Sequence, residues 1–288
     1  MRWANRTGDR APPARLLPFK PRARRASPMD LKIMTKTKTL ARLAFAAPFA
    51  LALAACNGSG DDAAGGSGEV PQGDPVAEVA APQGQEWTQV VTQTEQGGWL
   101  MGNPDAPIKL VEYGSLTCPA CASFSTNGVQ PLEEEYVKSG RVSFEFRSML
   151  LHGTADLVLT ELVSCGPVET VHPLANQVWA NLPQIQQDIQ ANGAQLEQAM
   201  SLAEDQRLPA FAEAAGLLDF FAARGISKEQ GRSCLADLDS MRSYAETSAN
   251  AAEEDAVDRT PTFFVNGRKL DASNWAQLEP ILQRAGAR

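Results

Sequence analysis

Two cysteines three residues apart, Cys118 and Cys121, have the types and spacing for thiol–disulfide chemistry. On a helix, residues at this spacing share one face and lie close enough to form a disulfide. Cys118 is expected to be the N-cap of that helix, with Pro119 in the first helical position, where a missing N–H costs nothing. Free backbone N–H groups and the helix dipole at such an end stabilise a thiolate, the reactive form of cysteine. We therefore expect Cys118 to be the nucleophile and Cys121 to resolve its mixed disulfide.

Such a cysteine pair can also be half of a zinc site, which needs four nitrogen or sulfur ligands. The other candidate ligands are scattered, and none of them forms a second close pair; they are Cys165, Cys234, His152 and His172. We therefore expect redox chemistry without a metal ion or another cofactor. The two histidines are expected to be surface or core residues rather than catalytic ones.

The segments around the pair are expected to position it. Residues 108–113 form a short, mostly apolar run that is typical of a buried strand and leads into the helix at Cys118. That helix is expected to continue to about Val137 with a kink or break at Pro131, since proline interrupts helical hydrogen bonding. Residues 141–147 alternate between apolar and polar side chains and predict a second strand.

The rest of the body adds one earlier strand, a long helical block, and a hairpin and helix at the end. Asn266-Gly267 between two β-prone runs is a strong signal for a tight hairpin turn. Ser273 is expected to cap the last helix. The predicted elements are a strand within 86–94, helices throughout 155–257, hairpin strands at 262–265 and 268–270, and a helix after Ser273.

Charge is distributed unevenly along the chain. Residues 1–55 carry 12 Lys and Arg against 2 Asp and Glu, whereas the rest of the chain carries 14 against 32. A body this acidic argues against nucleic-acid binding, which needs cations that displace the counterions of phosphate. The basic residues 1–55 are interpreted as a signal region, with Met29 or Met34 as the expected start of translation.

Within the signal region, residues 43–55 form an uncharged apolar run of 13 residues. This run is too short to span a bilayer as a helix but suits the core of a signal peptide. It ends in Leu-Ala-Ala-Cys56, which resembles the lipobox of bacterial lipoproteins and implies lipidation of Cys56; an ordinary secretory cleavage site is the alternative. A lipid anchor would hold the protein on the periplasmic side of a cell-envelope membrane. Residues 56–85, rich in Gly, Ser, Pro and Ala, are predicted to be a flexible tether.

The motifs around the cysteines resemble a known family. Residues 102–107 (GNPDAP) and 111–121 (VEYGSLTCPAC) resemble the active-site region of DsbA-type thioredoxin-fold proteins, and residues 260–267 (TPTFFVNG) resemble their cis-proline segment. The resemblance implies an α/β thioredoxin fold over 86–288, with a helical insertion at about 151–257 between core strands. It also implies periplasmic disulfide exchange with cysteine-containing exported proteins.

The resemblance assigns roles to individual residues. Cys118 is the nucleophile and Cys121 the resolving cysteine, while Pro261 is the cis-proline that faces them. Thr260 is the residue whose backbone pairs with substrate. Glu112 matches the buried acid near the disulfide, and could relay a proton to or from Cys121 because burial raises the pKa of a carboxyl group. An ordinary polar residue at the end of a strand is the alternative for Glu112.

One position departs from the strongly oxidising members of the family, which have His where this chain has Ala120. The Ala120 side chain offers the Cys118 thiolate no cation or donor, so we expect a thiol pKa between the values of DsbA, about 3.5, and thioredoxin, about 7. The expected function is that of an oxidase. We expect it to be a monomer and to be reoxidised by a DsbB-like membrane partner. A reductase or isomerase kept reduced by an electron-donating membrane partner, and a non-enzymatic metal-binding or scaffold lipoprotein, are the alternatives.

The two cysteines of the helical block form the last candidate site. Cys165 ends an apolar helical run, and Cys234 lies 69 residues further on. In an oxidising compartment we expect these thiols to form a structural disulfide, as in some alphaproteobacterial DsbA-like proteins with comparable insertion cysteines. Two buried free thiols are the alternative.

Overall fold

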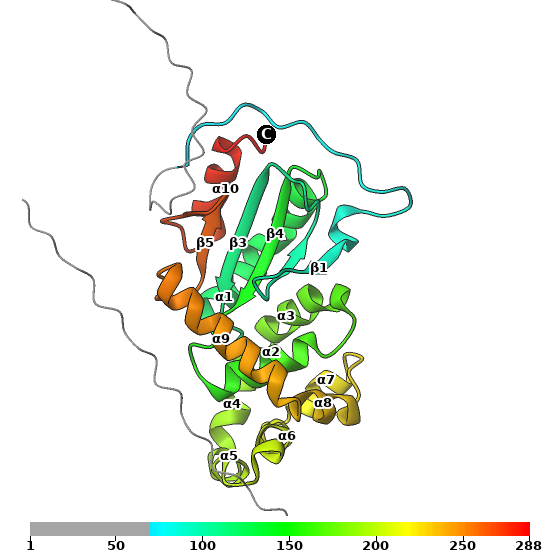
Figure 1. Ribbon diagram of the computed structural model, residues 1–288, viewed down its shortest axis with the longest axis vertical. Coiled ribbons are helices and arrows are strands. Elements are labelled where there is room, and N and C mark those ends of the chain that lie inside the picture. Colours follow the sequence, from blue (N-terminus) through cyan, green and yellow to red (C-terminus); the bar gives the residue numbers. More distant parts are fainter. Residues whose placement is uncertain (1–69) are drawn as a thin grey trace, which may run out of the picture. The chain divides into compact units, whose positions relative to one another are not determined.

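The centre of the fold is a mixed β-sheet. In the computed structural model, which describes residues 70–288, six strands form one sheet in the order β1-β2-β4-β3-β5-β6. Strands β3 and β4 are parallel neighbours at its centre, and the other neighbours are antiparallel (Figure 1). The strands are β1 (Val91–Gln93), β2 (Trp99–Met101), β3 (Ile108–Gly114), β4 (Val142–Ser148), β5 (Thr262–Val265) and β6 (Arg268–Lys269).

The strands predicted around the cysteine pair are confirmed. Strand β3 pairs with β4 from Ile108 opposite Val142 to Gly114 opposite Ser148. The turn between β5 and β6 has positive φ at both central residues, 49° at Asn266 and 78° at Gly267. Asn and Gly tolerate this conformation, whose twist matches that of the flanking strands. The sequence pattern therefore identified both the core strands and the closing hairpin.

The strand predicted at residues 86–94 is wrong over its first half. Residues Trp87–Gln89 form a 3₁₀ helix, and only Val91–Gln93 pair as β1. The Trp87 indole N–H donates to the carbonyl oxygen of Val79 at 2.7 Å, and the ring is buried. With this large ring buried, the backbone of residues 87–89 leaves the sheet. The alternation of side chains in the sequence gave no indication of this.

Part of the tether predicted at residues 56–85 is hydrogen-bonded to the rest of the fold. The backbone N–H groups of Gly73 and Val76 donate to the carbonyl oxygens of Arg284 and Gly286 at 2.9 and 2.8 Å. A Cβ at position 73 would lie 2.3 Å from the Ala285 carbonyl oxygen, so glycine permits this close approach. Residues 73–76 therefore lie along the end of the chain. The segment then passes to the other side of the sheet (Figure 1), while the signal region, Cys56 and the start of the tether lie outside the described residues.

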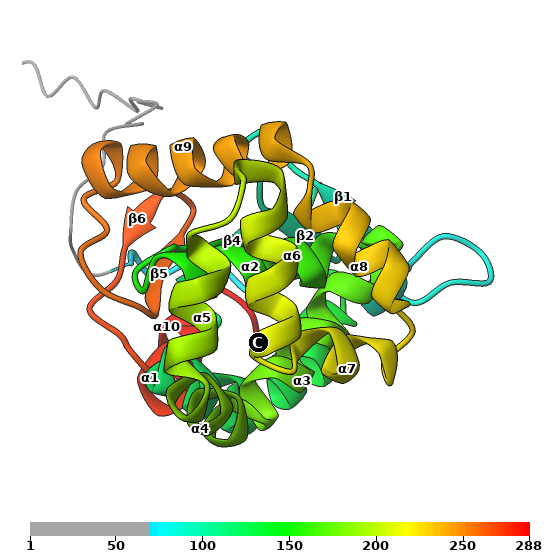
Figure 2. The ribbon, with the colours of Figure 1, turned by 90° about the horizontal axis from the view of Figure 1, so that it is seen from below.

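The helical block lies between β4 and β5, where the family resemblance placed an insertion. Figure 2 shows its helices grouped at one end of the sheet, with α9 along one side. Among residues 70–288, no helix is both long and apolar enough to cross a bilayer. The helices are α2 (Thr154–Ser164), α3 (Val171–Ala180), α4 (Leu182–Ala191), α5 (Gly193–Met200), α6 (Glu204–Ala214), α7 (Leu217–Ala222), α8 (Lys228–Leu235) and α9 (Leu238–Glu254).

The helix that begins after Cys118 departs from regular α geometry early. Only α1 (Pro119–Phe124) is α-helical, and wider π-helical turns follow at Ser125–Val129 and Leu132–Val137. These turns flank Pro131, which has no N–H for the helical hydrogen bonds. The predicted kink at this residue is therefore a change of helix type on both sides of it.

The last helix, α10 (Trp275–Arg284), is capped one residue later than predicted. The Asn274 side chain accepts from the Gln277 N–H at 3.1 Å, whereas the Ser273 N–H donates to the Gln277 side chain at 2.9 Å. Both Ser and Asn are good N-cap residues. Where they are neighbours, the backbone conformation decides which of them caps the helix.

Candidate active site

Cys118 lies where the sequence predicted, at the junction of a strand and a helix. It is the N-cap of α1, with extended backbone angles and with Pro119 in the first turn. Its Sγ lies 3.3 Å from the carbonyl oxygen of Thr260, and the Thr260–Pro261 peptide bond is cis. The structure thus brings the cysteine pair and the proline segment together, although 142 residues separate Cys118 from Thr260.

The surroundings of the two thiols separate their acidities. The pKa of Cys118 is lowered from 9.0 to about 5, first by a hydrogen bond from the Cys121 side chain, then by Thr260 and the backbone N–H groups of Cys121 and Ala120, against the opposing effect of burial. Burial, followed by the hydrogen bond to Cys118, raises the pKa of Cys121 well above its ordinary value. In this dithiol form the Thr260 hydroxyl is buried and has no hydrogen-bond partner within residues 70–288, so it can donate to a thiolate. Cys118 is thus the thiol that ionises, and Cys121 is the one that keeps its proton.

Glu112 lies beneath the cysteine pair on β3. Alternate residues of a strand share a face, so Glu112 points to the same side as Ile108 and Leu110, toward the core. Its side chain is fully buried, and neither carboxylate oxygen has a hydrogen-bond partner among the described residues. Burial, and then the charge of Cys118, raises its pKa to about 8. At neutral pH this carboxyl group therefore carries a proton. When it ionises, its negative charge raises the pKa of Cys121 further.

Comparison with known proteins identifies this arrangement. Residues 94–284 match the model of the protein family described as Thioredoxin, which covers most of the chain. The chain belongs to the thioredoxin family. Similar solved structures include a protein-disulfide isomerase from Novosphingobium aromaticivorans, 27% identical with a TM-score of 0.60, the match covering 66% of this chain and 97% of that one.

Two further relatives are similar over different lengths. The α-DsbA1 structure from Wolbachia pipientis is 20% identical with a TM-score of 0.52, covering 65% of this chain and 89% of that chain. Disulfide bond formation protein D of Bacillus subtilis is 31% identical over 58 residues, which are 20% of this chain and 26% of that protein. The match therefore spans about a quarter of this curated relative's length. The DsbA-like thioredoxin fold predicted from the sequence is confirmed.

The thioredoxin-family site includes residues that sequence reasoning did not single out. Thr117 precedes the nucleophile and hydrogen-bonds to Asp156, a fully buried residue of α2. One pattern in the sequence could have indicated that Asp156 is buried. It lies at helical spacing from apolar residues, so it falls on the same, buried face of its helix. Its place beside the nucleophile depended on the tertiary fold.

The two histidines have different surroundings. His172 is buried, with Nε2 3.0 Å from the carbonyl oxygen of Trp99, and burial lowers its pKa to about 4. His152 has a side chain that is 59% exposed, and its Nδ1 lies 2.6 Å from the Thr117 hydroxyl. His172 is thus a core residue, while His152 lies at the surface beside the active-site loop.

The surface next to Cys118 is hollowed on the side of the insertion. This hollow has a volume of about 430 Å³ and begins at Pro119 on α1. It has no charged side chain in its lining, which contrasts with the acidic composition of the chain. The lining residues are Pro119, Ala122, Ser123, Thr126, Asn127, Trp179, Ala180, Leu182, Pro183 and Gln186.

The insertion cysteines lie together, away from the reactive pair. The Sγ atoms of Cys165 and Cys234 are 2.08 Å apart, and the disulfide joins the end of α2 to α8. Cys118 and Cys121 are free thiols. Among residues 70–288, no cluster of three or more His, Cys, Asp or Glu side chains has a metal-binding arrangement.

Proposed function

We propose that this protein is a thiol–disulfide oxidoreductase of the cell envelope, and that it acts as an oxidase on cysteine-containing exported proteins. The observation that carries the proposal is the Cys118 thiol, which has a pKa of about 5 and lies against the carbonyl of Thr260 next to the cis bond of Pro261. This carbonyl accepts a hydrogen bond from the Cys118 thiol in its protonated form. Once Cys118 is a thiolate or part of a disulfide, the carbonyl can pair with the backbone of a bound substrate.

The exchange proceeds in two steps. A substrate thiolate attacks Cys118 Sγ of the oxidised protein, the Cys118–Cys121 bond breaks, and Cys121 leaves as a thiolate that takes a proton from Glu112. A second substrate thiolate then attacks the substrate sulfur of the mixed disulfide and releases Cys118 as a thiolate. The substrate loses two electrons and gains a disulfide, while the protein gains two electrons. Cys118 leaves readily because its pKa is low.

The direction of exchange follows from the stability of the reduced form. A low thiol pKa stabilises the reduced protein at neutral pH and makes its disulfide a better oxidant. The Cys118 pKa of about 5 lies between the values of about 3.5 for DsbA and about 7 for thioredoxin, so we place the protein between these two in oxidising strength. A DsbB-like membrane partner would then reoxidise the Cys118–Cys121 pair.

Isomerase or reductase activity is the second candidate function. The solved relative that is 27% identical is described as a protein-disulfide isomerase, which favours this alternative. The test is to trap the redox state of Cys118 and Cys121 in intact cells by acid quenching and alkylation, with Cys118→Ser as the control. A pair that is oxidised at rest supports the oxidase, and a pair that is reduced at rest overturns it in favour of the alternative.

The location in the envelope rests on the signal region and Cys56. A lipid anchor at Cys56 would keep the catalytic domain beside membrane redox partners. Replacement of Cys56 by Ser should release the protein from the membrane fraction while leaving its exchange activity in solution unchanged. A variant that stays in the membrane fraction would contradict the lipid anchor.

A further inference from the structure

A buried carboxylate lies behind the loop that leads to the nucleophile. Asp156, in the first turn of α2, is 0% exposed. Its Oδ1 accepts from the Ser115 hydroxyl at 2.9 Å, the Thr117 N–H at 3.1 Å and the Thr117 hydroxyl at 2.9 Å. Its Oδ2 accepts from the His152 N–H at 2.8 Å. All of these donors belong to the chain before Cys118 or to the loop that follows β4.

Placing a carboxylate inside a protein is costly unless donors replace its hydration. Among residues 70–288 no Lys or Arg forms an ion pair with Asp156, and the His152 ring has its Nδ1 3.7 Å from Oδ2. The loop of residues 115–117 therefore supplies most of the compensation. Because these hydrogen bonds are needed to offset the burial, the carboxylate holds the loop firmly in one conformation.

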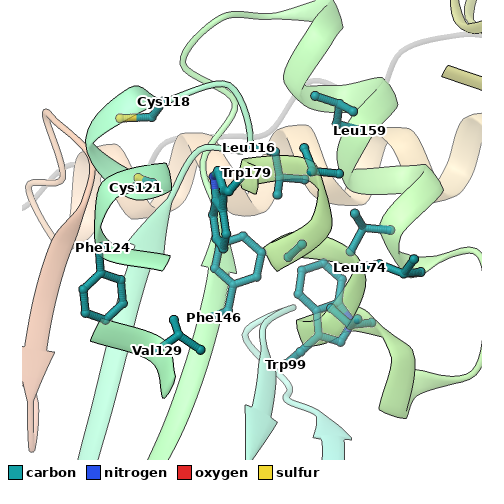
Figure 3. Packing of buried hydrophobic residues seen from close by; sticks show 14 of the residues in the cluster. Trp99, Leu116, Cys118, Cys121, Phe124, Val129, Phe146, Leu159, Leu174 and Trp179 are labelled. Carbon is teal, nitrogen blue, oxygen red and sulfur yellow. The ribbon is translucent and has the colours of Figure 1, made fainter. Parts of the chain in front are cut away.

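The insertion holds the carbonyl groups of the same loop. The Trp179 indole N–H donates to the Ser115 carbonyl at 3.0 Å, and the Gln186 side chain donates to the Thr117 carbonyl at 3.1 Å. The Ser115 carbonyl also accepts from the Cys118 N–H at 3.1 Å, so its position bears directly on the nucleophile. Figure 3 shows Leu116 and Trp179 close to the two cysteines.

We propose that Asp156 is a positioning residue for the nucleophile: through Ser115 and Thr117 it holds Cys118 at the N-terminus of α1 and against Thr260. This role rests on the proposed function, since it assigns the insertion a part in the reactivity of Cys118. The thiolate needs the backbone N–H groups of residues 120 and 121 at hydrogen-bonding distance, and a loosened loop would move the sulfur away from them.

Asp156 also fixes the orientation of His152. The Thr117 hydroxyl has one hydrogen, which it donates to Asp156. The same oxygen must therefore accept from His152 Nδ1–H at 2.6 Å, and this leaves Nε2 directed away from the network. One carboxylate thus orders the loop before the nucleophile and an exposed imidazole beside it.

The decisive experiment is a thiolate titration of the reduced protein, followed by ultraviolet absorbance, in wild type and Asp156→Asn. The same titration of Cys118→Ser is subtracted to isolate Cys118. Loss of positioning should raise the pKa of Cys118 by about one unit. At a pH below the wild-type pKa, this corresponds to a thiolate fraction about tenfold lower. Removing a nearby negative charge without moving the loop would lower this pKa instead. An unchanged or lowered Cys118 pKa would overturn the proposal.

The matched control is Glu161→Gln, the same acid-to-amide change at a buried residue of α2. Glu161 accepts from the Ser240 hydroxyl at 2.7 Å and is not bonded to residues 115–117. It should leave the pKa of Cys118 unchanged, even if urea unfolding shows a comparable loss of stability. A shift as large as that of Asp156→Asn would mean that any damage to α2 perturbs the site, and the positioning role would be lost.

A second variant, which changes no charge, keeps the proposal testable if Asp156→Asn does not fold. Thr117→Val removes the hydroxyl between His152 and Asp156 but keeps the backbone hydrogen bond, and it should raise the Cys118 pKa by a smaller amount. An unchanged pKa in this variant would count against the proposal. The titration needs no substrate, so a positive result stands even if the wild-type protein proves inactive toward protein disulfides, and that inactivity would refute only the proposed function.

Discussion

Replacement of Glu112 by Gln should make the stability of the protein less dependent on pH. The carboxyl group is fully buried and has no hydrogen-bond partner in the part of the chain that the structure describes, and its pKa is raised from 4.5 to about 8. Between these two values the native state binds more protons than the unfolded state, so the wild type loses unfolding free energy as the pH rises. The loss is about 3 kcal/mol by pH 7 and approaches about 5 kcal/mol above pH 8, at 1.36 kcal/mol per pKa unit. Glutamine has a similar shape but does not titrate.

The assay is urea unfolding of the reduced wild type and Glu112→Gln across this pH range. The free energy of unfolding of the variant, relative to wild type, should rise by about 4 kcal/mol from about pH 4.5 to about pH 8.5. Glu253→Gln, an exposed position on α9, is the control and should follow the wild type. Part of the Glu112 shift comes from the Cys118 charge, so the oxidised protein should show a smaller effect. A constant difference between variant and wild type at all pH values would refute the reasoning.

The remaining predictions concern the thiols and a helix cap. The alkylation rate of Cys118 should reach half its maximum at about pH 5 and stay flat through neutrality, because the thiolate is the reacting form; a midpoint near 9.0, the ordinary thiol value, would contradict the lowered pKa. Replacing Cys165 and Cys234 together by Ser should lower the free energy of unfolding by about 4 kcal/mol in denaturant titrations, since their disulfide closes a loop with a sequence separation of 69; no loss in non-reducing buffer would argue against a structural role. Asn274→Ala should cost about 1 kcal/mol by the same measurement, with Ser273→Ala costing less.

Local patterns were enough to predict the reactive centre. Cys118 is the N-cap of α1 with Pro119 behind it, as the spacing indicated, because N-cap chemistry depends on residues within one helical turn. The strands that carry the site, β3 and β4, followed from apolar runs and alternation, and the β5–β6 turn followed from Asn266-Gly267. Helix caps, strand alternation and tight turns depend on neighbouring residues, so the sequence alone can predict them.

Features that depend on segments far apart in the sequence could be identified only from the family resemblance or from the three-dimensional structure. The place of Pro261 opposite Cys118 came from the resemblance, since no local rule joins segments 142 residues apart. The cap of α10 is Asn274 rather than Ser273, and Gly73 and Val76 pair with the C-terminal end although the composition of their segment resembles a linker. The hydrogen-bond partners of a backbone group depend on which segments the fold brings next to it, and the amino-acid composition of a segment does not determine this.

The sequence alone was enough to predict Cys118 as the nucleophile and Cys121 as the resolving thiol, and to predict the strand and helix that carry them, because each prediction depends on residues close together in the chain. The tertiary structure decided how strongly these groups are perturbed. Glu112 loses its water and gains no hydrogen-bond partner only when the core closes over β3, and Asp156 meets the loop before Cys118 only when α2 packs behind it. Burial and long-range hydrogen bonds set the free energy of each charge, and both come into being only when distant segments meet.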